Sequence, residues 1–372
     1  MGIRPQGRIL LLVLAAGLLA TVTAACGDSN DSSSTSGSTG GGSASLSGEI
    51  AGAGSTAQQA AQEAWIAGFQ EANSGVSIAY DPVGSGGGRE QFTAGGVAYA
   101  GSDAALDPDE LKAAEGTCGG TNNVVEVPNY VSPIAIIYNV SGVDSLQLSP
   151  DTLAKIFAQK ITKWNDPAIA TDNPGADLPD TNITPVNRSD ESGTTENFTD
   201  YLSQAAPSIW TYEVSGDWPV KGGEAAEGTS GVVDAVTNGD GTIGYADASQ
   251  AGSLSVATVK VGSEFVGPTT EAAAKIFDES KPDSNPGANE FTYSLNRTPD
   301  ASDTYPIVLV SYLMGCTKYD DPNTAALVKA YFNYVISAEG QQVANSAAGS
   351  APLSDSVRQK IQPAVDAIGS AS

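Results

Sequence analysis

The protein has 372 residues, of which 17 are basic and 43 are acidic, so its formal net charge is −26. The sequence contains no histidine, which excludes Ser-His-Asp and Cys-His nucleophile systems, imidazole acid–base catalysis and His-ligated metal sites. A strongly negative chain does not attract nucleic acids or anionic membranes through its general field.

Residues 1–25 have the features of a secretory signal peptide. Arg4 and Arg8 give a positive start, and residues 9–20 form an apolar run. This run is too short for a bilayer, which takes about 20 residues. The following Thr23-Ala24-Ala25-Cys26-Gly27 resembles a bacterial lipoprotein cleavage site, after which Cys26 would be lipidated. Thr23 replaces the usual leucine, so the alternative is an ordinary signal peptide and an unmodified Cys26.

Residues 26–47 are expected to form the lipid-anchor cysteine and a Gly/Ser tether. Of the 21 residues from 27 to 47, 14 are Gly or Ser, a composition that cannot bury a core. Without residues 1–25 the chain keeps 15 basic and 43 acidic residues, a net charge of −28. The sequence therefore predicts a folded protein held at the outer face of a membrane.

Two cysteines remain in the folded part, Cys118 and Cys316. Disulfides persist in oxidising compartments, which exported proteins occupy. We expect one disulfide between them, with two separate buried thiols as the alternative.

The rest of the chain alternates strands and helices, and its length is sufficient for two domains. In chain order we expect strand 49–54, helix 57–73, strand 76–82, helix 89–93, strand 98–102, helix 108–115, strands 124–127 and 134–138, helix 150–158, strand 183–187, helices 195–204 and 230–237, strands 242–245 and 306–312, and helices 323–337 and 354–368. Polar stretches rich in Pro or Gly at 171–182 and 278–290 are expected to be surface loops. The alternation predicts an α/β fold with a largely parallel sheet.

Three predicted helix starts combine glycine with small hydroxyl residues. They are residues 52–57 (GAGSTA), 84–88 (GSGGG) and 188–195 (RSDESGTT). The first N–H groups of a helix lack intrahelical partners and carry positive partial charge, so they attract anions. A single start of this kind is usually only an N-cap. Three of them, one joined to Arg188, predict an oxyanion site at the carboxyl ends of the strands.

Asp103 follows the third predicted strand, where a carboxylate would repel an oxyanion. The repulsion is offset if the oxyanion carries a proton that Asp103 can accept. A fully deprotonated anion such as sulfate offers no such proton, which costs at least about 1–3 kcal/mol for an unsatisfied buried group. The alternative is that Asp103 caps a helix or lies in a surface turn.

The ordered set of loops resembles the periplasmic-type phosphate-binding protein of phosphate ABC transporters. The motifs lie at residues 52–56, 84–88, 100–104, 161–167 (ITKWNDP), 188–194, 218–223 (WPVKGG), 241–245 (GTIGY) and 340–342 (GQQ). Together they cover nearly all of residues 48–360 in order.

This resemblance implies a two-lobed, periplasmic-binding-protein-like α/β fold of the class II type, with phosphate in the interlobe cleft. We assign residues 48–138 plus 304–372 to lobe I and residues 139–303 to lobe II. The implied function is high-affinity binding of phosphate and its delivery to a membrane permease, without catalysis. It implies no cofactor and no metal, and we expect a monomer.

The resemblance also assigns the phosphate ligands. The expected binding residues are Ser55, Thr56, Ala57, Ser85, Asp103, Arg188, Ser192, Gly193 and Thr194. Ala57 would donate through its backbone, Asp103 would accept the phosphate proton, and Asp190 would orient Arg188. The chain departs from the family at Ala57, at Gly86, where a serine is common, and at Glu191, where a small residue is common.

Three other readings remain open at this point. Residues 52–57 satisfy the G-x-G-x-x-A dinucleotide pattern, and Asp81 lies where a ribose-binding acid is expected, so an exported oxidoreductase is one alternative. A phosphatase-like enzyme is a second, although neither histidine nor an evident acidic metal cluster is present to activate water. A cell-surface adhesin is the third, but it would not need the loop at 188–194.

Overall fold

The computed structural model describes residues 45–283 and 287–370. The predicted signal peptide, Cys26 and most of the tether lie outside these residues. Within the described ranges, no helix is long and apolar enough to cross a membrane.

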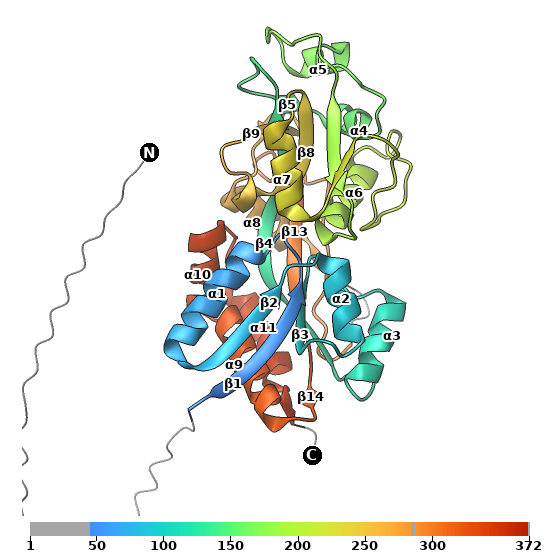
Figure 1. The fold of residues 1–372 in the computed structure, drawn as a ribbon. Helices are drawn as coiled ribbons and strands as arrows, with labels where there is room; N and C mark the ends of the chain where they lie inside the picture. The colour runs from blue at the N-terminus through green and yellow to red at the C-terminus, as the bar shows by residue number, and fades with distance from the viewer. Residues whose placement is uncertain (1–44, 284–286, 371–372) are drawn as a thin grey trace, which may run out of the picture. The chain divides into compact units, whose positions relative to one another are not determined.

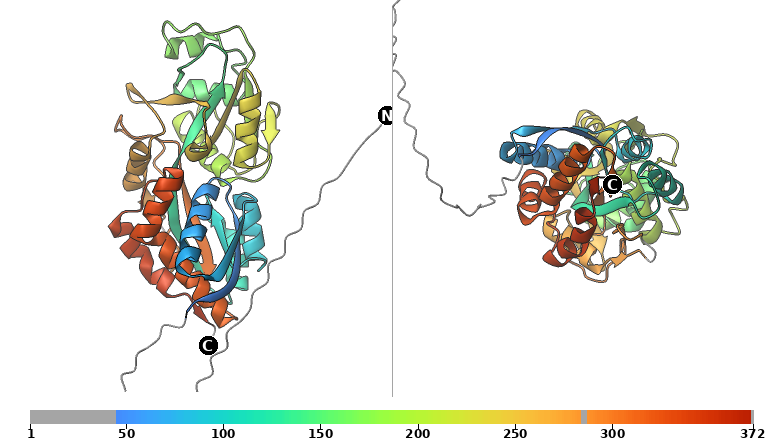
Figure 2. Two further views of the ribbon diagram at one scale, coloured as in Figure 1. Left: turned by 60° about the vertical axis from the view of Figure 1, so that its left-hand side comes forward. Right: turned by 90° about the horizontal axis from the view of Figure 1, so that it is seen from below.

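The first lobe, at the bottom of Figure 1, is built from both ends of the folded chain. Figure 2 shows the helices of the last third lying beside those that follow the first strand. Its N-terminal elements are β1 (Ser47–Gly54), α1 (Gln59–Ala72), β2 (Gly75–Asp81), α2 (Ser85–Thr93), β3 (Tyr99–Ser102) and α3 (Pro108–Thr117). Its C-terminal elements are β13 (Val308–Cys316), β14 (Lys318–Tyr319), α9 (Pro322–Ile336), α10 (Ala338–Ala348), α11 (Asp355–Asp366) and β15 (Gly369–Ser370).

The second lobe, at the top of Figure 1, comes from the middle of the chain. It holds β5 (Gln147–Leu148), α4 (Pro150–Phe157), α5 (Pro167–Asp172), β6 (Thr184–Arg188), α6 (Gly193–Ala205), β7 (Glu224–Ala226), α7 (Gly228–Asn238), β8 (Thr242–Asp247), β9 (Ser255–Val261) and β10 (Glu264–Val266). The segment with α8 (Thr270–Glu279), β11 (Lys281–Pro282) and β12 (Tyr293–Ser294) then returns along the first lobe, where Phe291 N–H donates to the Glu126 carbonyl at 2.8 Å.

One long strand, β4 (Val124–Asn139), belongs to both lobes. It pairs antiparallel with β13 from Val124 to Pro133 and with β8 from Ile134 to Asn139. The prediction of two separate strands at 124–127 and 134–138 was therefore wrong. Pro128 and Pro133 suggested a break, but the sheet tolerates both, because proline is accepted at irregular positions of a ladder. Pro128 lies next to a register shift, and Pro133 lies where the partner strand changes.

The main sheet has the order β2-β1-β3-β13-β4-β8-β6-β7, with β9 pairing to the second half of β4. It is mixed rather than largely parallel as predicted. β1 is parallel to β2 and β3, and β6 is parallel to β7 and β8, but β13 and β4 are antiparallel to their neighbours. The carboxyl ends of the parallel strands β1, β3 and β6 still point toward the boundary between the lobes.

The predicted apolar face of α1 is buried, with Ala61 and Trp65 fully inside and Phe69 4% exposed. These side chains contribute to a core that also contains most apolar side chains of β13 and β4; every residue of β13 and all of β4 except Asn139 are buried. A strand buried on both faces reads as a continuous apolar run, as β13 does.

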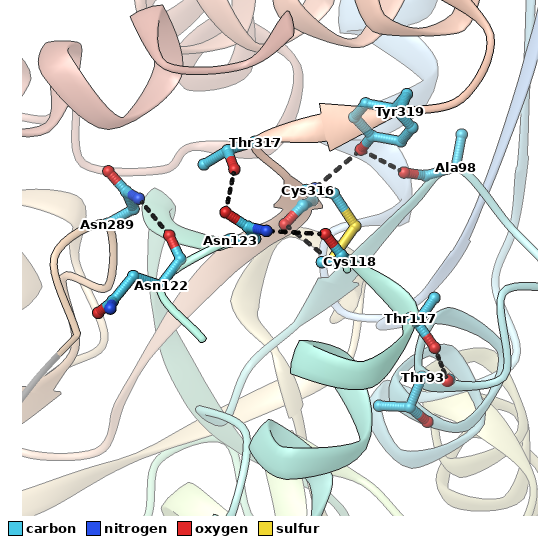
Figure 3. Close-up of a disulfide and its surroundings, with 11 residues drawn as sticks. Thr93, Ala98, Thr117, Cys118, Asn122, Asn123, Asn289, Cys316, Thr317 and Tyr319 are labelled. Atoms are coloured by element: carbon cyan, nitrogen blue, oxygen red, sulfur yellow. Dashed lines mark hydrogen bonds between the residues drawn. A yellow bond between two sulfur atoms is a disulfide. The ribbon is translucent and has the colours of Figure 1, made fainter. Parts of the chain in front are cut away.

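Cys118 and Cys316 form a disulfide with their Cα atoms 5.2 Å apart (Figure 3). It joins the end of α3 to the end of β13 across 198 positions of sequence. Asn123 donates to the Cys118 carbonyl at 3.2 Å, and Cys316 N–H donates to the Tyr319 hydroxyl at 3.0 Å. The disulfide lies within the first lobe, with both half-cystines on elements of that lobe.

Candidate functional site

The predicted loops converge where the two lobes meet. β1, β3 and β6 end at Gly54, Ser102 and Arg188; Ser55 and Asp103, which follow the first two strands, are buried, and so is Arg188 itself. The structure brings together all the residues assigned from sequence. Ser55, Thr56, Ala57, Ser85 and Asp103 come from the first lobe, and Arg188, Ser192, Gly193 and Thr194 from the second. Gly193 is buried, and each of the others is at most 7% exposed. The boundary between the lobes therefore carries the predicted cluster.

Asp103 lies at the centre of this cluster and is 3% exposed. Its Oδ2 accepts from Ser55 Oγ at 2.7 Å and from Thr194 Oγ1 at 3.4 Å. Its Oδ1 accepts from Ser311 Oγ at 2.6 Å, and its N–H donates to Ser85 Oγ at 3.1 Å. Because Thr194 belongs to the second lobe and the other partners to the first, this carboxylate links the two lobes.

Burial raises the pKa of Asp103, while the hydrogen bonds from Ser311, Ser55 and Thr194 and the charge of Arg188 act against that rise. The surrounding hydroxyls are thus directed at the ionised form. The negative charge of Asp103 is therefore balanced by the dipoles of these hydroxyls and by the guanidinium of Arg188.

Arg188 is 3% exposed and is held by Asp190. Its Nε donates to Asp190 Oδ1 at 2.8 Å, and its Nη2 donates to Oδ2. Burial would raise the pKa of Asp190, but hydrogen bonds and charge from Arg188, together with the N–H of Gly228, lower it overall. Within the described ranges, Nη1 of Arg188 has no protein acceptor, so this end of the guanidinium is free for another group.

The first loop is fixed by contacts to the second lobe. Thr56 Oγ1 lies 2.9 Å from Thr229 Oγ1 and accepts from Thr229 N–H at 3.1 Å. The Thr56 carbonyl accepts from Gln250 Nε2 at 2.8 Å. Ala57 N–H is directed at Ser55 Oγ, 3.1 Å away. A small hydroxyl and a peptide N–H therefore lie side by side before α1.

The start of α6 approaches the first lobe so closely that only glycine fits. A Cβ built on Gly193 would lie 2.7 Å from Asp103 Cβ and 2.7 Å from Ser85 Oγ, distances that real Cβ atoms do not show. Ser192 caps the helix by accepting from Thr195 N–H at 3.3 Å. The absent side chain of Gly193 thus lets the helix N-terminus reach Asp103.

Gly86 and Glu191, two positions at which the chain departs from the family pattern, lie next to each other in the structure. A Cβ on Gly86 would lie 2.7 Å from Glu191 Cβ, so a serine there would displace Glu191. Glu191 Oε1 pairs across the lobes with Arg89 Nη2 at 2.5 Å, while Arg89 Nε pairs with Glu110 at 2.9 Å. In this chain an interlobe ion pair occupies the space that a side chain on Gly86 would need.

Sequence reasoning missed Ser311, Thr229 and Gln250, which contact the assigned residues from distant segments. Ser311 stands alone among apolar residues in β13 and is fully buried, a signal that could have singled it out. The other two carried no local signal, since their partners lie 173 and 194 positions away. The whole arrangement offers hydroxyls, peptide N–H groups and one guanidinium around a single carboxylate, which suits a tetrahedral oxyanion that bears a proton.

Comparisons with known proteins agree with this geometry. Residues 36–339 match the PBP superfamily domain. The chain is 36% identical over 365 residues to the phosphate-binding protein PstS2 of Mycobacterium bovis (strain BCG / Pasteur 1173P2), covering 96% of this chain and 97% of that protein. It is 34% identical over 374 residues to the phosphate-binding protein PstS 3 of Mycobacterium leprae (strain TN), covering 95% and 98%.

Solved structures show the same fold. A high-affinity periplasmic phosphate-binding protein (PfluDING) bound with phosphate superposes with a TM-score of 0.69 at 25% identity, covering 85% of this chain and 93% of that one. A phosphate-binding protein from Stenotrophomonas maltophilia gives a TM-score of 0.67 at 22% identity, covering 85% and 94%. The predicted two-lobed α/β fold and the predicted family are confirmed. The chain therefore belongs to the PstS phosphate-binding proteins of the PBP superfamily.

Proposed function

We propose that this protein binds inorganic phosphate between its two lobes and delivers it to the permease of an ABC transporter, without chemical turnover. The observation that carries the proposal is the cluster of buried donors around Asp103, drawn from both lobes. Relatives with about a third of their residues identical over nearly the whole chain are phosphate-binding proteins, which supports the same ligand here.

Each assigned residue then has a stated role. Arg188 contacts one or two phosphate oxygens from the Nη1 side of its guanidinium. Asp190 holds the guanidinium through Nε and Nη2. The other donors are the hydroxyls of Thr56, Ser85, Ser192 and Thr194 and the N–H groups of Ala57, Gly193 and Thr194. Neutral donors supply most of the contacts, so the site binds an anion with little net positive charge of its own.

Asp103 selects for phosphate. Phosphate keeps at least one proton near neutral pH, and Asp103 accepts the hydrogen bond of that proton. Sulfate has no proton to donate and would face the carboxylate unpaired, which costs about 1–3 kcal/mol or more. The hydroxyls of Ser55 and Ser311 hold the carboxylate in its orientation.

Ligand binding is coupled to closure of the lobes, which the sequence assigned to residues 48–138 plus 304–372 and residues 139–303; α8, β11 and β12 of the latter range lie along the first lobe, and β4 joins the second lobe from Ile134 on. Three contacts support the coupling, since each joins one lobe to the other: Thr56 with Thr229, Asp103 with Thr194, and Arg89 with Glu191. The continuous strand β4 offers a hinge, because short crossings allow lobes to rotate as rigid bodies.

The protein is proposed to act outside the cell membrane as a monomer, anchored through a lipid on Cys26 after removal of residues 1–25. The apolar leader, the Gly/Ser-rich tether and the disulfide of the folded part support export to an oxidising compartment. The tether would let the folded part reach a permease in the same membrane, over about 25 Å.

The proposal is tested by titrating the purified protein with phosphate and with sulfate, using calorimetry with tryptophan fluorescence as a second readout. Saturable one-to-one phosphate binding, with sulfate at least about a hundredfold weaker, is the expected result from the cost of the unpaired carboxylate and its repulsion. Recovery of the bound phosphate unchanged would exclude turnover. Equal affinity for both anions, or no phosphate binding, would overturn the proposal.

A further inference from the structure

We infer that Asn197 and Arg297 form a positioning pair that fixes the backbone of Asp103 when the lobes close. The inference rests on the proposed function, because it concerns the carboxylate assigned to select phosphate. Neither side chain is among the assigned ligands, and both are buried, with Asn197 8% and Arg297 2% exposed.

Asn197 connects the two lobes through one amide group. It lies on α6 and its Nδ2 donates to the carbonyl of Gly193, one turn earlier, at 2.9 Å. The same Nδ2 donates across the boundary to the main-chain carbonyl of Asp103 at 2.7 Å. Both N–H bonds of the amide are therefore used, one within the second lobe and one between the lobes.

Arg297 determines which way this amide points. Its Nη2 donates to Asn197 Oδ1 at 2.6 Å, and a guanidinium can only donate, so the oxygen of Asn197 must face Arg297 and the nitrogen must face Asp103. Arg297 is itself held by Asp200 Oδ2 at 2.7 Å and by the Val308 carbonyl at 2.7 Å. The start of β13, next to the second crossing between the lobes, is thus connected to the Asp103 loop.

The Asp103 N–H donates within the first lobe to Ser85 Oγ at 3.1 Å, whereas the Asp103 carbonyl is held from the second lobe by Asn197. Residues 103–105 line a cavity of about 260 Å³ together with Asn197 and Arg297. A loop that borders a cavity is not held by close packing, so a hydrogen bond to its backbone decides where it lies. The Asn197 amide provides that bond from the second lobe and so helps to place the Asp103 main chain, while Ser55 and Ser311 hold the carboxylate itself.

Loss of the bond from Asn197 to Asp103 should weaken ligand binding and not only lower the stability of the protein. The bond from Asn197 to Asp103 joins the lobes, so it strengthens phosphate binding to the extent that binding brings the lobes together. Loss of the bond also frees the Asp103 loop, which weakens the preference for phosphate over sulfate. A merely structural side chain would affect both anions equally.

The test compares Asn197→Leu with the parent protein by phosphate and sulfate titration. We expect phosphate affinity to fall about ten- to a hundredfold, with faster dissociation, and the phosphate-to-sulfate ratio to fall with it. Asn173→Leu is the matched control. Asn173 is also 8% exposed, and its amide donates one turn back to Ile169 and to Gln147, all within the second lobe.

Two further measurements keep the inference falsifiable if Asn197→Leu lowers stability. In an Asp103→Asn background, Asn197→Leu should still weaken binding by loss of the interlobe bond to the main-chain carbonyl, but it should no longer change the phosphate-to-sulfate ratio, because the carboxylate that it positions is gone. Arg297→Lys keeps the charge beside Asp200 but loses the fork, and it should give the same loss of selectivity to a smaller extent. If the parent protein binds phosphate and Asn197→Leu retains its affinity and selectivity, the inference is wrong. Failure of the parent to bind phosphate would instead refute the proposed function.

Discussion

Replacing Asp103 by asparagine tests the chemistry of the site most directly. The change preserves the shape of the side chain but removes its charge and converts one acceptor oxygen into a donor. In the structure the carboxylate accepts three hydroxyl hydrogen bonds, at 2.6, 2.7 and 3.4 Å. Because hydroxyl groups can rotate, Ser55 and Ser311 can still pair with an amide, so the local structure should survive.

The magnitude follows from the difference between charged and neutral hydrogen bonds. A hydrogen bond to a charged group contributes about 1.5–3 kcal/mol and a neutral one about 0.5–1.5 kcal/mol. Loss of the carboxylate that accepts the phosphate proton should therefore cost about 1–2 kcal/mol, which is about five- to thirtyfold in Kd. Sulfate should bind more tightly than to the parent, because an amide N–H can donate to it. Since burial raises the pKa of Asp103, the ionised carboxylate is costly to bury, and asparagine should not lower the free energy of unfolding without ligand.

The assay is calorimetric titration of both variants with phosphate and sulfate, combined with urea denaturation. Asp247→Asn is a suitable control, because Asp247 is also buried and accepts from the hydroxyls of Tyr130 and Ser249, neither of which is an assigned phosphate ligand. It should leave the phosphate-to-sulfate ratio unchanged. An Asp103→Asn protein that is as selective as the parent would show that Asp103 does not recognise the proton.

Three other changes address the guanidinium, a buried acid and the disulfide. Arg188→Lys should weaken phosphate binding at least about tenfold in calorimetry, because lysine cannot pair with Asp190 and contact phosphate through one planar fork. Burial raises the pKa of Glu126 to about 8 from 4.5, so the folded state keeps a proton that the unfolded state loses as pH rises through this range. The free energy of unfolding should therefore fall as pH rises from about 5 to 8. In urea denaturation, Glu126→Gln should make this fall less steep by up to about 1.4 kcal/mol per pH unit. A variant with the same pH dependence as the parent would contradict this prediction. Replacing Cys118 and Cys316 by serine should lower the free energy of unfolding by about 2–4 kcal/mol and leave phosphate affinity unaltered, since the bridge constrains the unfolded chain.

Local signals in the sequence were sufficient for much of the fold. The alternation of apolar strands with helical stretches located β1, β2, β3 and β6, and glycine with a hydroxyl residue marked the starts of α2 and α6. The sequence did not reveal that β4 is one strand, because proline usually ends a strand, and the tolerance of Pro128 and Pro133 depends on partners far along the chain. The antiparallel setting of β13 was hidden for the same reason, since strand direction is decided by tertiary pairing.

The candidate site divides in a similar way. Its loops could be predicted because backbone N–H groups, glycine and small hydroxyls are a local signature of anion binding. The residues that hold those loops could not, since Ser311 reaches Asp103 over 208 positions and Arg297 reaches Asn197 over 100. Such pairs depend on two chain segments meeting, which a single sequence does not encode in any short pattern.

The place of β13 in the sheet has a consequence for how the chain is made. β13 lies between β3 and β4, so the first lobe cannot complete its sheet until residue 316 has been synthesised. The N-terminal third therefore waits, with apolar strand edges unpaired, while most of the polypeptide emerges. Pairings over such long sequence separations slow folding, and a chain whose strands stay unpaired in this way would remain open for the passage across a membrane that the proposed export requires.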